Sequence, residues 1–225
     1  MQVTLINHMG TDLSVVNAAR VSFAKESDWV WLEDEDGIPY DTDISEKDKK
    51  LIHYLAKNKH KSPFNHAFLS FRVKAPIFVA RQLVKHEYLP WNEVSRRYVK
   101  DGLECSEIKW RVAADNVKQG SGGLIEIEDS VEADRIYFET VNNCFNSYHS
   151  LIDIGVCPEQ ARCVLPLSLM TEWIWSGSLY AFMKMCKLRL DAHAQQETRE
   201  VAEEIYKHIS ELFPVSAKAL MEYAE

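Results

Sequence analysis

Cationic side chains are concentrated between Arg81 and Lys100. The segment holds five Lys or Arg residues against two Glu residues, a local excess of three positive charges. Such an excess suits a small phosphorylated ligand, because Ser95 can donate to a phosphate oxygen while Arg96 or Arg97 offers a bidentate guanidinium. A solvated basic face is the commoner explanation of such a cluster. The residue types alone therefore leave both interpretations open.

A second pair of reactive side chains lies near the C-terminal end of the sequence. On a helical wheel of residues 178–193, apolar residues gather on one arc, and Arg189 and His193 fall at its edge or inside it. Burying an unpaired charge is costly, so Arg189 needs a partner. An ion pair with a carboxylate and a ligand-binding role are equally good explanations at this point.

The usual templates of nucleophilic and phosphate-binding chemistry are missing from the sequence. It contains no nucleophile elbow, no P-loop and no GxGxxG fingerprint. The five cysteines form no CxxC pair, so neither a disulfide framework nor a metal site is expected. Cys163 is the one candidate nucleophile, but its apolar surroundings favour a buried, inert thiol.

Composition narrows the class of protein. The chain has 225 residues, of which 26 are Lys or Arg and 34 are Asp or Glu, giving a formal charge of −8. Net negative charge argues against a nucleic-acid or acidic-membrane partner. No apolar run reaches the roughly 18 residues that span a bilayer, and the N-terminus lacks a signal-peptide pattern. A cytoplasmic protein is therefore expected.

Hydrophobic periodicity predicts the elements that must position these side chains. Strands are expected at 2–7 and 67–74, and helices at 12–21, 45–57 and 77–86, with Ser45 and Asp48 forming a capping box and Pro76 opening the third helix. Further helices are expected at 131–154, 158–188, 192–212 and 215–224, and loops at 25–43 and 119–123. With no repeat and no long linker, one α+β domain covering residues 1–225 is the simplest organisation.

Eight segments, in one collinear order from residue 20 to about residue 200, resemble the flavin-dependent thymidylate synthases. They are RVSF at 20–23, HKSPFNH at 60–66, APIFVARQ at 75–82, NEVSRRY at 92–98, KQG at 118–120, ARCVLPL at 161–167, TEWIW at 171–175 and LRLDAHAQQE at 188–197. The order of eight segments is far more specific than any one of them.

The resemblance implies a reaction and a fold. The reaction is reductive methylation of dUMP to dTMP, with methylenetetrahydrofolate as carbon donor, NADPH as reductant and FAD as hydride relay. It needs no cysteine nucleophile, in agreement with the lack of an activated thiol. The implied fold is α+β, with a central mixed or antiparallel sheet and a helix-rich C-terminal third, in a homotetramer whose active sites form between subunits.

The resemblance also implies roles for individual residues. Arg189 matches the family arginine that contacts the uracil and stabilises charge developing on the ring. His193 matches a histidine near the expected folate entrance. At position 96 the family usually has Gly, so only the backbone N–H of Arg96 carries over with its role. The other dUMP positions are Gln82, Lys85, Glu93, Ser95, Arg97 and Arg162, and the FAD positions are Ser22, His60, Ser62, Lys85, His86, Glu87, Asn92, Glu93, Ser178, Tyr180 and Lys184.

The sequence departs from the family pattern on the flavin side. The usual Arg-His-Arg triplet reads Lys85, His86, Glu87, and Tyr180 stands where many members carry an arginine. Lys184, one helical turn after Tyr180, can supply the missing positive charge, as can Lys59 or Lys61 beside His60. Because lysine offers a point charge rather than a planar fork, weaker flavin binding is expected.

Four alternatives to flavin-dependent methylation of dUMP remain open. A related flavin enzyme could act on another pyrimidine nucleotide such as dCMP. A catalytically silent relative could have kept the phosphate site and lost the flavin, which Glu87 and Tyr180 favour. A synthase that depends on Cys163 would lose turnover in a Cys163→Ala variant. Nucleic-acid binding is the weakest alternative, since the basic segment is short and the chain is acidic.

Overall fold

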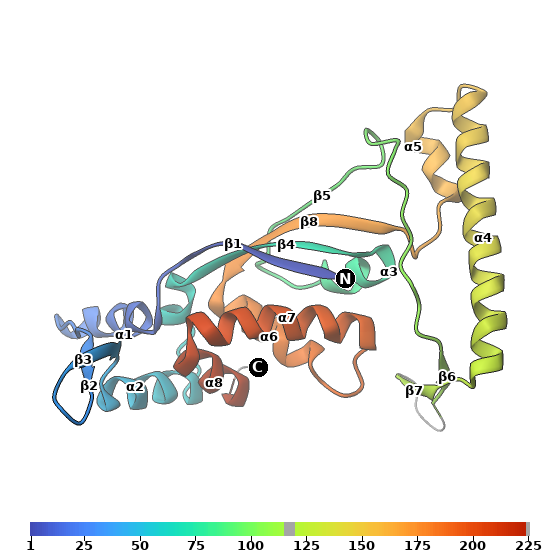
Figure 1. Ribbon diagram of the computed structural model, residues 1–225. Helices are drawn as coiled ribbons and strands as arrows, with labels where there is room; N and C mark the ends of the chain where they lie inside the picture. Colours follow the sequence, from blue (N-terminus) through green and yellow to red (C-terminus); the bar gives the residue numbers. More distant parts are fainter. Residues whose placement is uncertain (115–119, 224–225) are drawn as a thin grey trace.

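A four-stranded antiparallel sheet forms the centre of the computed structural model, which describes residues 1–114 and 120–223 (Figure 1). The strand order is β1-β4-β8-β5. The strands are β1 (Gln2–Met9), β4 (Phe68–Pro76), β5 (Trp91–Glu93) and β8 (Met170–Ser178). The α+β class with an antiparallel sheet and a helical C-terminal part is as the sequence predicts.

The longest ladder joins β4 to β8 in nine pairs, from Phe68↔Ser178 to Pro76↔Met170. On one face, Phe71 lies opposite Trp175 and Val73 lies opposite Trp173, and all four are buried. The other face carries polar side chains: the Ser70 and Ser176 hydroxyls are 2.8 Å apart, and Arg72, which pairs with Ile174 in the ladder, donates diagonally to Glu172 at 3.0 Å. An antiparallel sheet with one buried and one polar face follows from this alternation.

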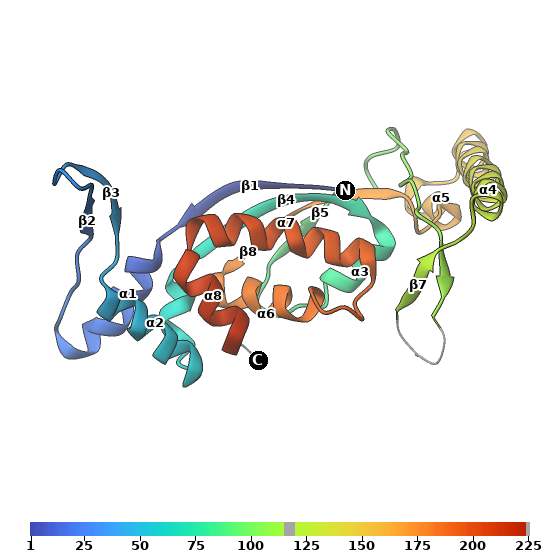
Figure 2. The same cartoon turned by 60° about the horizontal axis from the view of Figure 1, so that its bottom comes forward.

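Four helices gather on the buried face of the sheet (Figure 2). They are α3 (Ile77–Leu83), α6 (Leu179–Arg189), α7 (Gln196–Leu212) and α8 (Pro214–Tyr223). Their buried side chains pack with those of β4 and β8 in the core, where Phe182 lies edge-on to both Phe71 and Trp175 at ring-centroid distances of 5.1 and 5.3 Å.

Two of these helices start at opposite ends of the β4–β8 ladder. The Ile77 N–H at the start of α3 donates to Leu169 O at 2.9 Å, and the Leu179 N–H at the start of α6 donates to Ala67 O at 2.8 Å. Eight residue steps of the ladder span about 27 Å, and the seven residues of α3 plus the eleven of α6 span about the same length. The C-terminal ends of α3 and α6 therefore meet beneath the sheet.

Several elements lie at the end of the sheet where α6 begins. They are α1 (Asp12–Arg20), the 3-10 turn η1 (Val21–Phe23), α2 (Glu46–Lys57) and the 3-10 turn η2 (Ser62–His66). The Ser45 hydroxyl accepts from the Asp48 N–H, confirming the predicted helix start. The loop expected at 25–43 is partly wrong, because β2 (Val30–Glu33) and β3 (Pro39–Asp43) form a hairpin there. Trp31 and Tyr40 are exposed on this hairpin. Because the hairpin does not bury one face in the core, its sequence lacks the alternation from which a strand is predicted.

At the opposite end, a long helix stands apart from the sheet (Figure 1). This is α4 (Ile127–Asp153), which packs with α5 (Pro158–Ala161) and the 3-10 turn η3 (Arg162–Val164). Two short strands precede it, β6 (Arg111–Ala113) and β7 (Ser121–Leu124). The loop expected at 119–123 is therefore wrong over 121–123, and residue 119 lies outside the described residues.

The prediction of one helix over 158–188 is wrong. The structure places α5, η3, all of β8 and most of α6 in this range. The apolar positions of β8 continue directly into those of α6, which is buried on almost every side, so the pattern of apolar residues resembles one helix across a strand.

None of the helices formed by the described residues has the length and hydrophobicity that a membrane span needs.

Gly177 in β8 is required by the close approach of the 84–90 loop. A Cβ atom there would lie 2.3 Å from Leu89 Cδ2 and 3.0 Å from Tyr88 O. We expect Gly177→Ala to lower the free energy of unfolding by about 1–3 kcal/mol, measured by urea denaturation. Gly123→Ala is the control, since a Cβ atom at that position would meet nothing within 4 Å. Equal losses in the two variants would contradict this packing argument.

Candidate functional site

A cavity of about 710 Å³ opens between η2, the turn after α3 and the first turns of α6. Three lysines line it, Lys61, Lys85 and Lys184, against the single carboxylate of Glu87. The remaining lining residues are Asn65, Phe68, His86, Tyr88, Ser178, Tyr180 and Ala181. The cavity, here called the lysine cavity, thus combines a net positive charge with amide, hydroxyl and aromatic groups.

The lysine cavity brings together six of the residues that the resemblance assigns to FAD: Lys85, His86, Glu87, Ser178, Tyr180 and Lys184. The Lys61 ammonium lies over the Tyr180 ring, 5.4 Å from its centroid. The Ser178 hydroxyl caps α6 by accepting from the Ala181 N–H at 3.2 Å and donates to Asn65 Oδ1 at 2.7 Å. Ser178 therefore also has a local structural role.

Arg189 lies where the C-terminal ends of α3 and α6 meet. Its Nε–H donates to His86 Nε2 at 2.9 Å, and one Nη2–H donates to Gln82 O at 2.9 Å. Gln82 O belongs to the last turn of α3, whose carbonyls lack partners within the helix and carry partial negative charge. Neither partner is a carboxylate, so the ion pair offered as one explanation of this cation is not formed with any of the described residues.

The His86 imidazole is held in its neutral form by these surroundings. Burial lowers the pKa of His86, and the nearby positive charges of Arg189 and Lys184 lower it further, to about 4. Burial also lowers the pKa of Arg189. A neutral imidazole that accepts at Nε2 carries its proton on Nδ1, so the hydrogen bond selects the tautomer.

A second cavity, of about 410 Å³, lies between β5, the turn that follows it and η3. Four residues that the resemblance assigns to the nucleotide line it: Glu93, Ser95, Arg96 and Arg162. This cavity, here called the serine–arginine cavity, shares no lining residue with the lysine cavity. The predicted site residues that line the two cavities thus form two separate groups within one chain.

Hydrogen bonds fix the residues of the serine–arginine cavity. The Glu93 carboxylate accepts from Thr171 Oγ1 at 2.7 Å and from Trp91 Nε1 at 3.1 Å. The Arg96 guanidinium donates to backbone carbonyls of its own turn, Asp101 O at 2.7 Å and Gly102 O at 3.0 Å. The Arg96 charge therefore points toward its own turn. Among the described residues, the Ser95 hydroxyl accepts only from the Arg97 N–H, at 3.3 Å.

The other predicted site residues lie outside both cavities. Arg97 pairs with Glu159 at 3.1 Å, and the Gln82 amide donates to the Gln195 side chain. Ser22 in η1, His60, Ser62 in η2 and Asn92 in β5 are exposed.

His193 does not share a helix face with Arg189. The helix α6 ends at Arg189, and His193 lies in the following turn. There it is exposed, and its Nδ1 lies 2.9 Å from Asp191 Oδ1. Cys163 is likewise exposed rather than buried, because η3 turns it away from the core.

The structure adds residues that motif reasoning missed. Asn65 and Tyr88 line the lysine cavity, and Gln195 holds Gln82. Asn65 and Gln195 lie inside the matched segments HKSPFNH and LRLDAHAQQE. Membership in these segments was the sequence feature from which both could have been predicted as site residues. Tyr88 has a positive φ of 61°, a conformation that few non-glycine residues adopt. No feature of the sequence predicts this conformation.

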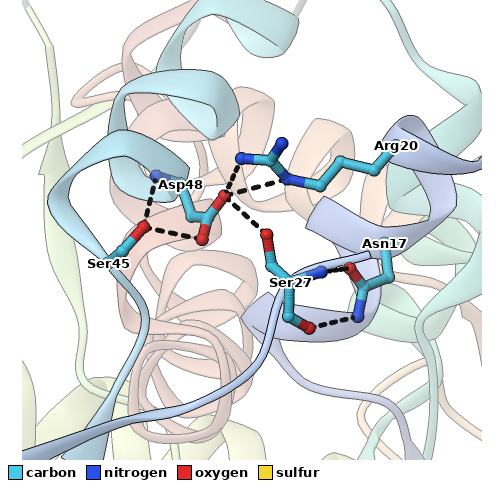
Figure 3. A network of polar contacts seen from close by, with 5 residues as sticks. All are labelled: Asn17, Arg20, Ser27, Ser45 and Asp48. Atoms are coloured by element: carbon cyan, nitrogen blue, oxygen red, sulfur yellow. Dashed lines mark hydrogen bonds and ion pairs between the residues drawn. The ribbon is translucent and has the colours of Figure 1, made fainter. Parts of the chain in front are cut away.

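A polar network holds the segment that carries Ser22 (Figure 3). Asp48 is 2% exposed and accepts from Arg20 Nε at 3.1 Å and Ser27 Oγ at 3.1 Å, while the Ser45 hydroxyl donates to it at 2.7 Å. Asn17 exchanges two hydrogen bonds with the Ser27 backbone, at 2.8 and 3.0 Å. The network therefore ties α1 and the chain after η1 to the start of α2.

Comparison with known proteins reveals relatives along nearly the whole chain. Residues 4–215 match the Thymidylate synthase complementing protein family. The flavin-dependent thymidylate synthase of Thermotoga neapolitana is 37% identical over 222 residues, covering 99% of this chain and 91% of the relative. That of Thermus thermophilus is 35% identical over 223 residues, covering 98% and 76%. The chain belongs to the flavin-dependent thymidylate synthase family.

Solved structures agree with this membership. The crystal structure of a UMP/dUMP methylase, PolB from Streptomyces cacaoi, bound with 5-Br dUMP, superposes with a TM-score of 0.81 at 31% identity, covering 99% of this chain and 95% of that one. The same methylase bound with 5-Br UMP gives a TM-score of 0.82 at 27% identity, covering 99% and 94%. The predicted family and fold are confirmed.

The Asp48 network yields a prediction for stability. Burial raises the pKa of Asp48, but hydrogen bonds from Arg20, Ser45 and Ser27 outweigh it, so the net pKa lies below its usual value. We expect Asp48→Asn to lower the free energy of unfolding by about 3 kcal/mol at pH 7, because Arg20 is left half-buried without its partner.

The loss of unfolding free energy in Asp48→Asn should become smaller as the pH falls. A carboxylate whose pKa is depressed on folding stabilises the protein fully above its unfolded pKa, near 4, and this contribution disappears as the pH falls through the lower folded pKa. Urea denaturation at a series of pH values measures the difference between the two proteins. Glu132→Gln, in the exposed pair with Arg135, is the control. A difference that grows below pH 4 would contradict the assignment.

Proposed function

We propose that this protein methylates dUMP reductively to dTMP, with methylenetetrahydrofolate as carbon donor, NADPH as reductant and FAD as hydride relay. The family membership supports the reaction class. The observation that carries the proposal is the lysine cavity, in which six side chains predicted for FAD converge beside the anchored Arg189.

The donors of the lysine cavity fit FAD. Three ammonium groups suit a diphosphate, and Asn65 and His86 offer hydrogen-bonding groups for the polar edges of the cofactor. Lys61 and Lys184 provide positive charge on the side where Glu87 and Tyr180 depart from the family pattern. When bound there, FAD would supply hydride transfer to the pyrimidine ring.

The chain's own residues bind and polarise the nucleotide. Ser95, Arg162 and the Arg96 backbone N–H hold the phosphate in the serine–arginine cavity, with Glu93 near the ribose. Arg189 contacts the uracil and stabilises the negative charge that develops on the ring, since a guanidinium in a half-buried position acts in a medium of low polarity. His193 in the exposed turn after α6 is proposed to lie near the folate entrance.

A homotetramer with shared active sites explains why one chain presents two separate cavities. In this arrangement the serine–arginine cavity of one subunit faces the lysine cavity of another. The helix α4 supports assembly, because Ile127, Val131, Ile136 and Phe138 are all exposed on a single chain. Covering them requires a partner.

Methylation of UMP is a second candidate. It is favoured by the two PolB structures, whose ligands are a deoxyribonucleotide and a ribonucleotide analogue. Product formation from dUMP, UMP and dCMP, each at equal concentration, would rank the three nucleotides as substrates.

An anaerobic spectrum of the purified protein tests the main proposal. We expect added FAD to be bleached by NADPH and its colour to return, with dTMP formed, only when dUMP and methylenetetrahydrofolate are both present. Binding of dUMP without any binding of FAD would instead identify a silent nucleotide-binding relative. A Cys163→Ala variant without turnover would favour the cysteine mechanism.

Lys184→Ala provides a prediction for flavin affinity. Removing one of three ammonium groups from the lysine cavity should weaken FAD binding by about tenfold, measured by titration of flavin fluorescence. Lys207→Ala, an exposed lysine on α7 outside the cavity, should leave the affinity unchanged. An unchanged affinity in Lys184→Ala would withdraw Lys184 from this role.

A further inference from the structure

We propose that His86 is a positioning residue for Arg189: its neutral Nε2, together with the Gln82 carbonyl, fixes the plane and direction of the guanidinium that meets the pyrimidine. The inference rests on the proposed nucleotide-binding function, and it gives His86 a task separate from contact with FAD.

The hydrogen bonds of Arg189 define the orientation of its guanidinium. Two of its five N–H groups are used, Nε–H by His86 at 2.9 Å and one Nη2–H by Gln82 O at 2.9 Å. Because the guanidinium is planar, two bonds from different nitrogens fix its plane and its rotation. The other three N–H groups have no partner among the described residues and remain for a ligand with acceptor oxygens, such as a pyrimidine edge.

The choice of a neutral acceptor has a chemical consequence. A carboxylate at the position of His86 would neutralise the guanidinium, whereas a neutral imidazole and a backbone carbonyl orient it and leave its full positive charge. Burial lowers the pKa of His86 most, and the positive charges of Arg189 and Lys184 add to this effect, so the imidazole stays neutral. Arg189 and Lys184 face it from α6, Lys61 lines the same cavity, and on its own turn Lys85 and Glu87 carry opposite charges on either side of it.

The fold makes this arrangement rigid. Gln82 O lies in the last turn of α3, Gln82 is held in turn by Gln195, and the loop that carries His86 is pressed against Gly177 of β8. Arg189 closes α6. The position of the guanidinium is therefore fixed by the two helix ends that the β4–β8 ladder directs toward each other.

A double-mutant cycle tests the role. In the FAD-loaded protein, His86→Leu should weaken dUMP binding about tenfold or more, measured by calorimetry, while His86→Gln, which retains an acceptor near the Nε2 position, should stay within about threefold of the wild type. In an Arg189→Ala background, His86→Leu should have no further effect, because His86 acts through Arg189. Equal, additive losses in both backgrounds would overturn the inference.

A measurement without nucleotide separates this inference from the proposed function. Nitrogen NMR of histidine-labelled protein should show His86 as the neutral, Nδ1-protonated tautomer at pH 6, and Arg189→Ala should raise its pKa by removing a neighbouring positive charge. If that result holds while neither dUMP nor UMP binds, the function fails and the pairing stands. A His86 protonated at Nε2 in the wild type would overturn the pairing itself.

Discussion

The antiparallel pairing of β4 with β8 is the interaction on which the rest of the structure depends. Its buried face carries Trp173 and Trp175. The helices α3 and α6 begin at its two ends and run in opposite directions along the sheet. Because the combined length of the helices matches that of the ladder, their last turns meet. Gln82 O, in the last turn of α3 where carbonyls lack partners within the helix, then accepts a hydrogen bond from Arg189 at the end of α6.

The division of the candidate site into two cavities follows from the same sheet. The serine–arginine cavity forms beside the β5 edge, near the start of β8, whereas the lysine cavity forms where β8 ends and α6 begins. A strand of nine residues separates these two ends of β8. One chain therefore presents two separate cavities, and the proposed function assigns the phosphate to one and the flavin to the other, with assembly of several copies bringing them together.

Sequence reasoning predicted the family, the sheet class and β4, whose apolar positions alternate cleanly. It missed β8, since buried positions on a central strand and on a buried helix form one continuous apolar run. Arg189 was recognisable as a cation on an apolar arc. Its partners were not, because Gln82 and His86 lie 107 and 103 positions away and one of them contributes only a backbone carbonyl. Likewise, no pattern places Lys61 over the Tyr180 ring, which requires η2 to lie beside α6.

Subunit mixing tests most directly the claim that this chain methylates nucleotides at sites assembled from both cavities. Arg162→Ala impairs the serine–arginine cavity and Arg189→Ala impairs the α3–α6 junction, so each protein alone should form almost no dTMP. When the two are dissociated, mixed and reassembled, the account predicts that activity returns, because some sites then combine an intact half from each variant. Mixed oligomers that remain inactive, with their composition verified by mass spectrometry, would contradict it.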